Sequence, residues 1–289
     1  MTLSNASAFD AFAAGYDDDF THSPLARLLR PRVWAHLAEQ FRSGQHLLEL
    51  TCGTGEDAVW LARQGLRVTA TDGSAEMVRV AQAKAARAGV AEQVQVARVS
   101  LQEIAALSQE AIIPLTHPPS PLERDDQREG GEGKFDGAFS NFGGLNTIGD
   151  WQPLAQALAA LVRPGGRLVL VPMGPFCPWE ISWHLLHGQP RTAFRRFGGP
   201  APAKIGPAVI PIWYPSTRRL RRDFSPWFRH LYTESLELWL PPSYLAHLVE
   251  RWPKLFARLN DFERATAHVT RSWGDHYIII FERKMEIRD

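Results

Sequence analysis

Short apolar runs alternate with segments of helical periodicity along most of the chain. The runs that predict strands lie at 45–50, 66–71, 94–99, 135–141, 167–173 and 275–283. Apolar positions three or four residues apart predict helices at 24–41, 56–64, 74–89, 101–107, 151–162 and about 243–269. Strands that alternate with helices of this length are typical of βαβ units. The pattern therefore predicts an α/β fold, with a mostly parallel sheet and helices on both faces.

Two segments interrupt this alternation. Residues 114–134 are rich in proline, glycine and charge and hold almost no side chain that could be buried. That composition predicts a disordered surface insertion. Residues 174–240 are instead rich in phenylalanine, tyrosine and tryptophan, which predicts an ordered cap inserted after the fifth strand.

Composition and charge narrow the class of protein. A chain of 289 residues that is 45% hydrophobic is long enough for one large core. A net charge of +1 gives no overall field that would attract nucleic acid or an anionic membrane. The two cysteines, the absence of a signal-peptide pattern and the lack of a membrane-length apolar run predict a cytoplasmic protein without integral membrane association.

The loop TCGTG at 51–55 follows the first predicted strand, and ligands of open parallel sheets bind beyond such strand ends. Gly53 and Gly55 permit a tight turn and the close approach of a ligand. Asp72 ends the second predicted strand, where a carboxylate can accept hydrogen bonds from ribose hydroxyls. The loop and Asp72 together predict a ligand that contains adenosine.

The charges around the loop distinguish between two such ligands. Ala58 could serve as the third small residue of a dinucleotide fingerprint, so the spacing alone leaves a nicotinamide cofactor open. Glu56 and Asp57 begin the next helix, however, and their charge would repel a pyrophosphate, while Glu49 adds a third acid. A cationic ligand without phosphate, such as S-adenosylmethionine, fits these charges better.

Four stretches in sequence order resemble the class I S-adenosylmethionine-dependent methyltransferases: LLELTCGTG, TATDGSAEMV, FDGAFSNFG and ALAALVRPGGRLVLVPM. The resemblance covers about 9–172 and the final strand. It implies a Rossmann-like, seven-stranded sheet whose last strand is antiparallel, with S-adenosylmethionine as co-substrate. The methyltransferase domain would then consist of 1–173 and 241–289, with 174–240 as the inserted cap.

The resemblance also implies roles for individual residues. Glu49, Gly53 and Gly55 would lie along the methionine end, and Asp72 would bind the ribose diol. Gly73 and Met77 would border the adenine. Thr51 departs from the glycine that usually begins the family loop, and Ser100 or Leu101 replaces an acid that often binds the adenine amine. The expected cofactor-binding residues are Tyr16, Glu49, Thr51, Gly53, Gly55, Asp72, Gly73, Met77, Ser100, Leu101, Asn141 and Phe142.

Two histidines are candidates for a catalytic base. His276 begins the final strand and would lie at the cofactor edge if that strand is antiparallel, although Asp275 and His276 could simply form a turn. His184 and His187 share a helix face at i, i+3 and could instead belong to the surface or to the cap core. Neither this pair nor Cys52 has further ligands at metal spacing, so we predict no metal.

The predicted cap supplies the acceptor-binding candidates, which are Trp183, His187, Trp213, Arg219 and Arg221. Aromatic rings can hold an apolar acceptor and stabilise a sulfonium. The arginines at 218–222 predict either a solvated strand face or contact with an anionic acceptor or membrane surface.

The sequence thus predicts methylation of an O, N or C atom of a small molecule, anionic or aromatic, rather than of nucleic acid. Two alternatives stay open, a nucleic-acid or protein N-methyltransferase and a non-catalytic module that binds S-adenosylmethionine. The first commonly carries a polar residue and Pro-Pro-aromatic after the fourth strand, where this chain reads SNFG at 140–143.

Overall fold

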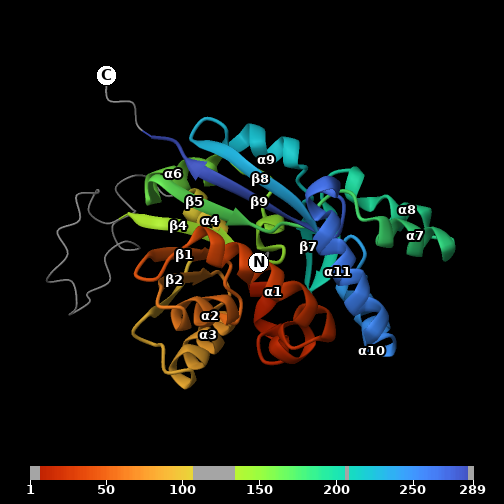
Figure 1. Cartoon of the computed structure of the whole chain (residues 1–289), viewed down its shortest axis with the longest axis horizontal. Helices are drawn as coiled ribbons and strands as arrows, with labels where there is room; N and C mark the ends of the chain where they lie inside the picture. The colour runs from red at the N-terminus through yellow and green to blue at the C-terminus, as the bar shows by residue number, and fades with distance from the viewer. Residues whose placement is uncertain (1–6, 107–133, 206–207, 286–289) are drawn as a thin grey trace, which may run out of the picture.

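The computed structural model describes residues 7–106, 134–205 and 208–285 (Figure 1). Its main sheet contains β1 (His46–Leu50), β2 (Arg67–Asp72), β3 (Val94–Arg98), β4 (Phe135–Ser140), β5 (Val162–Leu170), β8 (Phe228–Leu236) and β9 (His276–Arg283). A separate hairpin contains β6 (Ala201–Ile205) and β7 (Ala208–Ile212). The predicted insertion at 114–134 lies outside the described residues.

The helices near the sheet are α1 (Pro24–Gln40), α2 (Glu56–Arg63), α3 (Ala75–Arg87), α4 (Leu101–Ala105), α6 (Gln152–Leu161), α9 (Thr217–Phe224), α10 (Ala246–Arg251) and α11 (Pro253–Thr270). Helices α7 (Pro178–Leu186) and α8 (Pro190–Ala193) follow β5. Short 3-10 or π-helical turns are η1 (Ser7–Phe12), η2 (Asp17–Thr21), η4 (Gly144–Thr147), η5 (Arg195–Phe197) and η6 (Ser243–Leu245). Among the described residues, no helix is both long enough and apolar enough to span a membrane.

The main sheet has seven strands in the order β3-β2-β1-β4-β5-β9-β8. β9 is antiparallel to both of its neighbours, whereas β1 to β5 pair in parallel. This confirms the predicted seven-stranded, mostly parallel sheet with an antiparallel last strand. In the β1–β2 register Leu50 is opposite Thr71, so the loop after β1 and the end of β2 meet at one edge.

The position of the seventh strand was not predicted, and β8 corrects the expected extent of the cap. β8 lies within 174–240, but it pairs with β9 along the main sheet. α9, just before it, contributes buried side chains to the same core as α6. The part of 174–240 that lies outside the main sheet and its core is therefore shorter than predicted, because 217–236 belong to the sheet and its covering layer.

Two apolar cores cover the two faces of the sheet. One contains buried side chains from α1, α2, α3, α10 and α11, and the other contains side chains from α4, α6 and α9. Figure 1 shows α2 and α3 below the sheet and α6 and α9 above it. Side chains alternate between the cores along β9, where Ile278 and Ile280 face the first and Tyr277 and Ile279 the second.

A third apolar cluster lies at the carboxyl edge of the parallel strands. Ala8 of η1 packs with Ile210 and Ile212 of β7, and Met173, after β5, packs against them. The β6–β7 hairpin, which is part of the predicted cap, therefore contacts the N-terminal segment of the chain. Both lie over the edge at which the sequence predicts a ligand.

Candidate active site

The loop after β1 contains a residue in a conformation that favours glycine. Thr51 has φ 54°, which is costly for a β-branched residue. Its hydroxyl donates to the Leu50 carbonyl at 2.5 Å and lies 3.0 Å from Ser140 Oγ. A Cβ on Gly144 would lie 1.8 Å from Thr51 Oγ1, so the glycine at 144 leaves room for the threonine. The departure from the family pattern at Thr51 is thus accommodated by neighbouring residues.

Asp72 holds this loop against the end of β2. Its Oδ2 accepts from the Gly53 N–H and its Oδ1 from the Ser74 N–H, both at 2.9 Å. Burial raises the pKa of Asp72, although the N–H groups of Ser74 and Gly53 oppose the rise. Asp72 therefore ends β2 beside the loop and fixes the shape of the loop, while its binding of a ribose stays a prediction.

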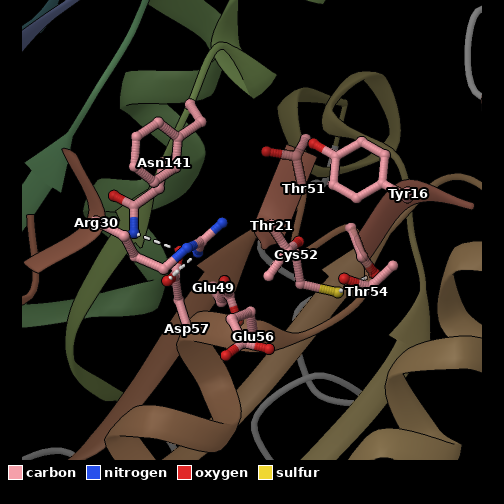
Figure 2. Close-up of a pocket in the computed structure, with 12 residues that line it drawn as sticks. Tyr16, Thr21, Arg30, Glu49, Thr51, Cys52, Thr54, Glu56, Asp57 and Asn141 are labelled. Carbon is pink, nitrogen blue, oxygen red and sulfur yellow. Dashed lines mark hydrogen bonds and ion pairs between the residues drawn. The ribbon is translucent and has the colours of Figure 1, made fainter. Parts of the chain in front are cut away.

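A pocket opens at this edge of the sheet (Figure 2). Six predicted cofactor residues line it: Tyr16, Glu49, Thr51, Gly53, Asn141 and Phe142. Six residues that were not predicted as contacts also line it: Thr21, Arg30, Cys52, Thr54, Glu56 and Asp57. Figure 2 shows Arg30, Asp57 and Asn141 on one side, with Tyr16 and Thr54 on the other and Glu49 between them.

Asp57 is the centre of a polar network on one wall of the pocket. Its Oδ1 accepts from Arg30 at 2.5 Å and from Trp34 Nε1 at 2.8 Å. Its Oδ2 accepts from Asn141 Nδ2 at 2.9 Å. The Arg30 guanidinium also lies 5.0 Å from the centre of the Phe142 ring. The network joins α1, α2 and the end of β4, three elements that are far apart in sequence.

Several buried polar atoms of the pocket have no hydrogen-bond partner. They are Thr21 Oγ1, Arg30 Nε, Glu49 Oε2 and Asn141 Oδ1. Leaving such groups unpaired is costly, so they indicate a polar ligand. The two acceptors Glu49 and Asn141 suit an ammonium group, and Arg30 suits a carboxylate. The methionine part of S-adenosylmethionine carries both groups, and the residues present fit it.

Glu49 is the most deeply buried acid of the pocket, with 2% of its surface exposed. Burial raises the pKa of Glu49 well above its usual range, and the neighbouring Asp57 adds to the rise. Burial thus disfavours the ionised form of this carboxyl group in the free protein. A cation bound beside it would favour the ionised form and would gain from the interaction.

The N-terminal segment covers the pocket through charged residues. Asp17 accepts from Thr54 Oγ1 at 2.6 Å and from Lys84 Nζ at 2.8 Å, and Lys84 also donates to Glu56 at 2.9 Å. Asp10 accepts from Ser74 Oγ at 2.5 Å. The two acids at the start of α2 are therefore both paired, Glu56 with Lys84 and Asp57 with Arg30. Their charge is largely compensated, which the sequence argument did not foresee.

The residues predicted beside adenine have local roles in the structure. Met77 is buried, and its N–H donates to Ser74 Oγ at 3.1 Å. The Gly73 carbonyl accepts from Arg98 Nε at 3.3 Å. Ser100 caps α4 and exchanges hydrogen bonds with Glu103. Leu101 is buried in the core on the α6 side. Their contact with a cofactor stays a prediction.

His276 lies at the same edge of the sheet, as predicted from an antiparallel last strand. Its ring meets the Phe142 ring edge to face, with centres 6.0 Å apart. Nδ1 is 2.8 Å from Glu237 Oε2 and 3.3 Å from Asp275 Oδ2. The structure therefore joins a candidate base to a residue that lines the pocket.

The candidates on α7 make contacts away from the pocket. His184 Nδ1 is 2.8 Å from Gln189 Oε1, and His187 Nδ1 is 2.7 Å from the Trp183 carbonyl oxygen. The Trp183 and His187 rings lie 4.3 Å apart. Within the described residues, none of these three side chains lines the pocket. Their role in catalysis or in acceptor binding stays a prediction.

Trp213 lies over the loop that follows β4. Its backbone N–H donates to the Asn146 carbonyl at 2.9 Å, and a Cβ on Gly149 would lie 2.5 Å from its indole Nε1. The Asn146 side chain binds the Met173 carbonyl and N–H at 2.9 Å each and the Trp213 carbonyl at 2.5 Å. Asn146, which the sequence did not single out, thus joins the β4 loop to the ends of β5 and β7.

The predicted strand with alternating arginines is wrong, because 217–224 form α9. Arg219 Nε donates to Asp223 at 2.6 Å, and its guanidinium lies 5.6 Å from the Trp151 ring centre. Arg221 is exposed. The side chain that anchors this helix is Leu220, which is fully buried. Binding of an anionic acceptor by Arg219 or Arg221 stays a prediction.

Three potential metal ligands lie close together in the described part of the chain. Glu237, Asp275 and His276 have ligand atoms within 4.8 Å of one another. Asp275 is already paired with the buried guanidinium of Arg196, which places a cation at the site. Cys52, for which the sequence offers no further ligands at metal spacing, is buried, and burial raises the pKa of its thiol well above the usual range. The prediction that the protein binds no metal is not tested by these observations.

Comparison with known proteins identifies the family to which the chain belongs. Residues 22–222 match a family described as a methyltransferase domain. A ubiquinone/menaquinone biosynthesis C-methyltransferase, UbiE of Rubrivivax gelatinosus, is 41% identical over 78 residues, which are 26% of this chain and 30% of that protein. The chain thus aligns with about a third or less of the length of the curated relatives it matches.

Two solved structures share the fold at low sequence identity. A methyltransferase dependent on S-adenosylmethionine from Mesorhizobium loti has a TM-score of 0.52 at 16% identity, covering 91% of this chain and 99% of its own. The DhpI–SAH complex has a TM-score of 0.55 at 15% identity, covering 98% of this chain and all of its own.

Proposed function

Because the chain belongs to a family of methyltransferase domains, we propose that it is a class I S-adenosylmethionine-dependent methyltransferase whose methyl acceptor is a small molecule. The observation that carries this proposal is the cover over the pocket. Asp10 and Asp17 tie the N-terminal segment to Ser74 and to Thr54. The β6–β7 hairpin packs against that segment through Ile210 and Ile212, which contact Ala8. A site covered by two segments favours a small acceptor over a nucleic-acid or protein surface.

The chain's own residues would bind the co-substrate by its charged groups. S-adenosylmethionine supplies an activated methyl group on a sulfonium, and the sulfur leaves as a neutral thioether. Glu49 and Asn141 offer acceptors for the ammonium, and Arg30 offers a donor for the carboxylate. Asp72 offers a carboxylate for the ribose hydroxyls. Phe142 and Tyr16 present aromatic rings in the pocket, which suit a sulfonium and exclude water.

Aligning the reactants and removing water are the main tasks for this reaction, because the leaving group is already good. The ion pair between Arg30 and Asp57 keeps one wall of the pocket rigid. The polar atoms that have no hydrogen-bond partner remain free to bind the methionine part of the ligand. The cover formed by the N-terminal segment would exclude solvent once the acceptor is bound.

The acceptor class can be tested with S-adenosylmethionine that carries an isotope label in its methyl group. The purified protein is incubated with a cell extract separated into a small-molecule fraction, a protein fraction and a nucleic-acid fraction. We expect the label in the small-molecule fraction. A sample to which S-adenosylhomocysteine is added in excess serves as the control. Label confined to protein or nucleic acid would contradict the proposal.

A further inference from the structure

The start of β9 carries a histidine held by a buried carboxyl group, at the edge of the sheet where the pocket opens. His276 forms a bridge with Met173, just after β5, and is opposite Leu236 at the end of β8. Because β9 is antiparallel, its first residue lies at the carboxyl edge of β4 and β5. Phe142 connects the pocket with the start of β9, because it lines the pocket and also packs against the His276 ring.

The two nitrogens of this imidazole have different surroundings. Nδ1 is 2.8 Å from Glu237 Oε2, a distance typical of a charge-assisted hydrogen bond. Within the described residues Nε2 makes no hydrogen bond, and the His276 side chain keeps 11% of its surface exposed. A carboxylate acceptor at Nδ1 favours the tautomer with the proton on Nδ1, which leaves a lone pair on Nε2.

Glu237 is held in place by a second buried carboxyl group. Its backbone has φ 68°, an uncommon conformation for a non-glycine residue. Glu263, with none of its surface exposed, accepts from the Glu237 N–H at 2.5 Å and from the Trp239 N–H at 2.9 Å. Arg32 of α1 pairs with Glu263. The strained turn after β8 is thus fixed by an ion pair between α1 and α11.

Asp275, although adjacent to His276, is held by another partner. Arg196 pairs with Asp275 and, at 2.7 Å, with Glu180 of α7. The charged groups around His276 are therefore Glu237, Asp275 and Arg196. Burial alone would lower the pKa of His276, but Asp275 and Glu237 outweigh burial and raise it. Burial and Asp275 raise the pKa of Glu237 to about 8, although His276 opposes the rise, so the form with an ionised Glu237 and a neutral His276 is reached towards alkaline pH.

We propose that His276 Nε2 is the general base that deprotonates the methyl acceptor, and that Glu237 is the residue that positions it. The proposal rests on the proposed function. The acceptor would be a hydroxyl or an activated carbon acid, which must lose a proton to become a good nucleophile. The proton moves to Nε2, the electron pair it leaves forms the bond to the methyl carbon, and the carbon–sulfur pair stays on sulfur. The imidazolium is stabilised by Glu237 and then releases its proton to water.

The tautomer can be measured without any co-substrate or acceptor, by nitrogen NMR of protein labelled in its histidine side chains. The His276→Gln variant assigns the signals. Above the pKa of His276 we expect the proton on Nδ1 and a bare Nε2. The opposite tautomer would overturn the proposal. A stoichiometric shift of the same signals by added Mg²⁺ or Zn²⁺ would also overturn it, because the three side chains would then form a metal site.

The Glu237→Gln variant tests the positioning role, since it keeps the shape of the side chain and removes its charge. Loss of a carboxylate at hydrogen-bond distance should lower the pKa of His276 by about one unit or more. An unchanged titration midpoint in a variant that keeps its melting temperature would show that Glu237 is only structural. If the variant does not fold, the wild-type tautomer still decides the proposal.

Measuring both methyl transfer and cofactor affinity shows whether His276 acts as a general base or only contacts the cofactor. In the labelled-methyl assay with the extract fraction, His276→Gln should reduce transfer by about a hundredfold or more. Calorimetry should show unchanged affinity for S-adenosylhomocysteine. His268→Gln, an exposed histidine of α11, is the matched control and should keep its activity. Lost affinity or undiminished transfer in His276→Gln would overturn the assignment, whereas a wild-type protein that binds no S-adenosylhomocysteine would refute the proposed function instead.

Discussion

Replacing Arg196 with methionine is expected to lower the free energy of unfolding by about 3–5 kcal/mol. The Arg196 side chain is 5% exposed and pairs with Glu180 and Asp275, which are themselves buried. Its guanidinium also lies 4.6 Å from the Tyr214 ring centre. Methionine fills much of the same space but leaves the buried Asp275 beside Glu237 without its arginine partner, while Glu180 keeps only Arg195. A buried charge without its partner costs far more than the pair contributes when intact.

Denaturant unfolding followed by tryptophan fluorescence measures this loss. Arg191→Met is the matched control, because Arg191 is exposed on α8, and a change of less than about 0.5 kcal/mol is expected there. If Arg196→Met were as stable as the wild type, the buried ion pairs would not hold the segment after β5 to the sheet.

Replacing Asp72 with alanine is expected to weaken binding of S-adenosylhomocysteine by about ten- to a hundredfold. Losing hydrogen bonds to a charged group costs about 1.5–3 kcal/mol, which corresponds to that range of affinity. The structure adds a second reason, because Asp72 accepts from the N–H groups of Gly53 and Ser74 and so shapes the loop. The alanine variant loses the anchor of the loop and the carboxylate that is predicted to bind the ribose.

Isothermal calorimetry measures the dissociation constants, and circular dichroism checks that the variant remains folded. Glu92→Ala removes an exposed acid in the turn before β3 and should bind the ligand as the wild type does. An unchanged dissociation constant for Asp72→Ala would remove this residue from the binding site.

The strands and helices up to β5 could be predicted because each has a clear local pattern. Their apolar periodicity is uninterrupted, and glycine marks helix ends at Gly65 and Gly89, both with positive φ. β8 could not be predicted in this way. Its pattern is hidden in an aromatic segment, and what makes it a strand is pairing with β9, about forty residues later. Such long-range pairing leaves no local signal.

The residues of the site that lie at strand ends could be predicted more readily than the residues that α1 and α2 contribute. Gly53, Asp72 and Asn141 follow strand ends, so their positions follow from the topology. Arg30 lies on a long helix and meets Asp57, 27 residues away, and only tertiary packing brings them together. From the sequence, Asp57 was predicted to be an unpaired acid at the start of a helix, but in the structure it is buried and paired with Arg30.

Glu237, the partner of the proposed base, could likewise not be predicted from the sequence. His276 could be placed at the cofactor edge from the direction of the last strand. Its partner could not be found, because Glu237 follows a strand that was not predicted and depends on Glu263 for its conformation. A charged residue in an aromatic segment carries no sequence signal for burial.

The central claim is that the pocket between the β1 loop, α1 and the N-terminal segment binds S-adenosylmethionine. Calorimetric titration of the purified protein with S-adenosylhomocysteine and, separately, with NAD⁺ tests it most directly. We expect one S-adenosylhomocysteine to bind per chain and NAD⁺ not to bind, since the unpaired polar atoms of Glu49, Asn141 and Arg30 match an ammonium and a carboxylate. Binding of NAD⁺ without binding of S-adenosylhomocysteine would contradict it.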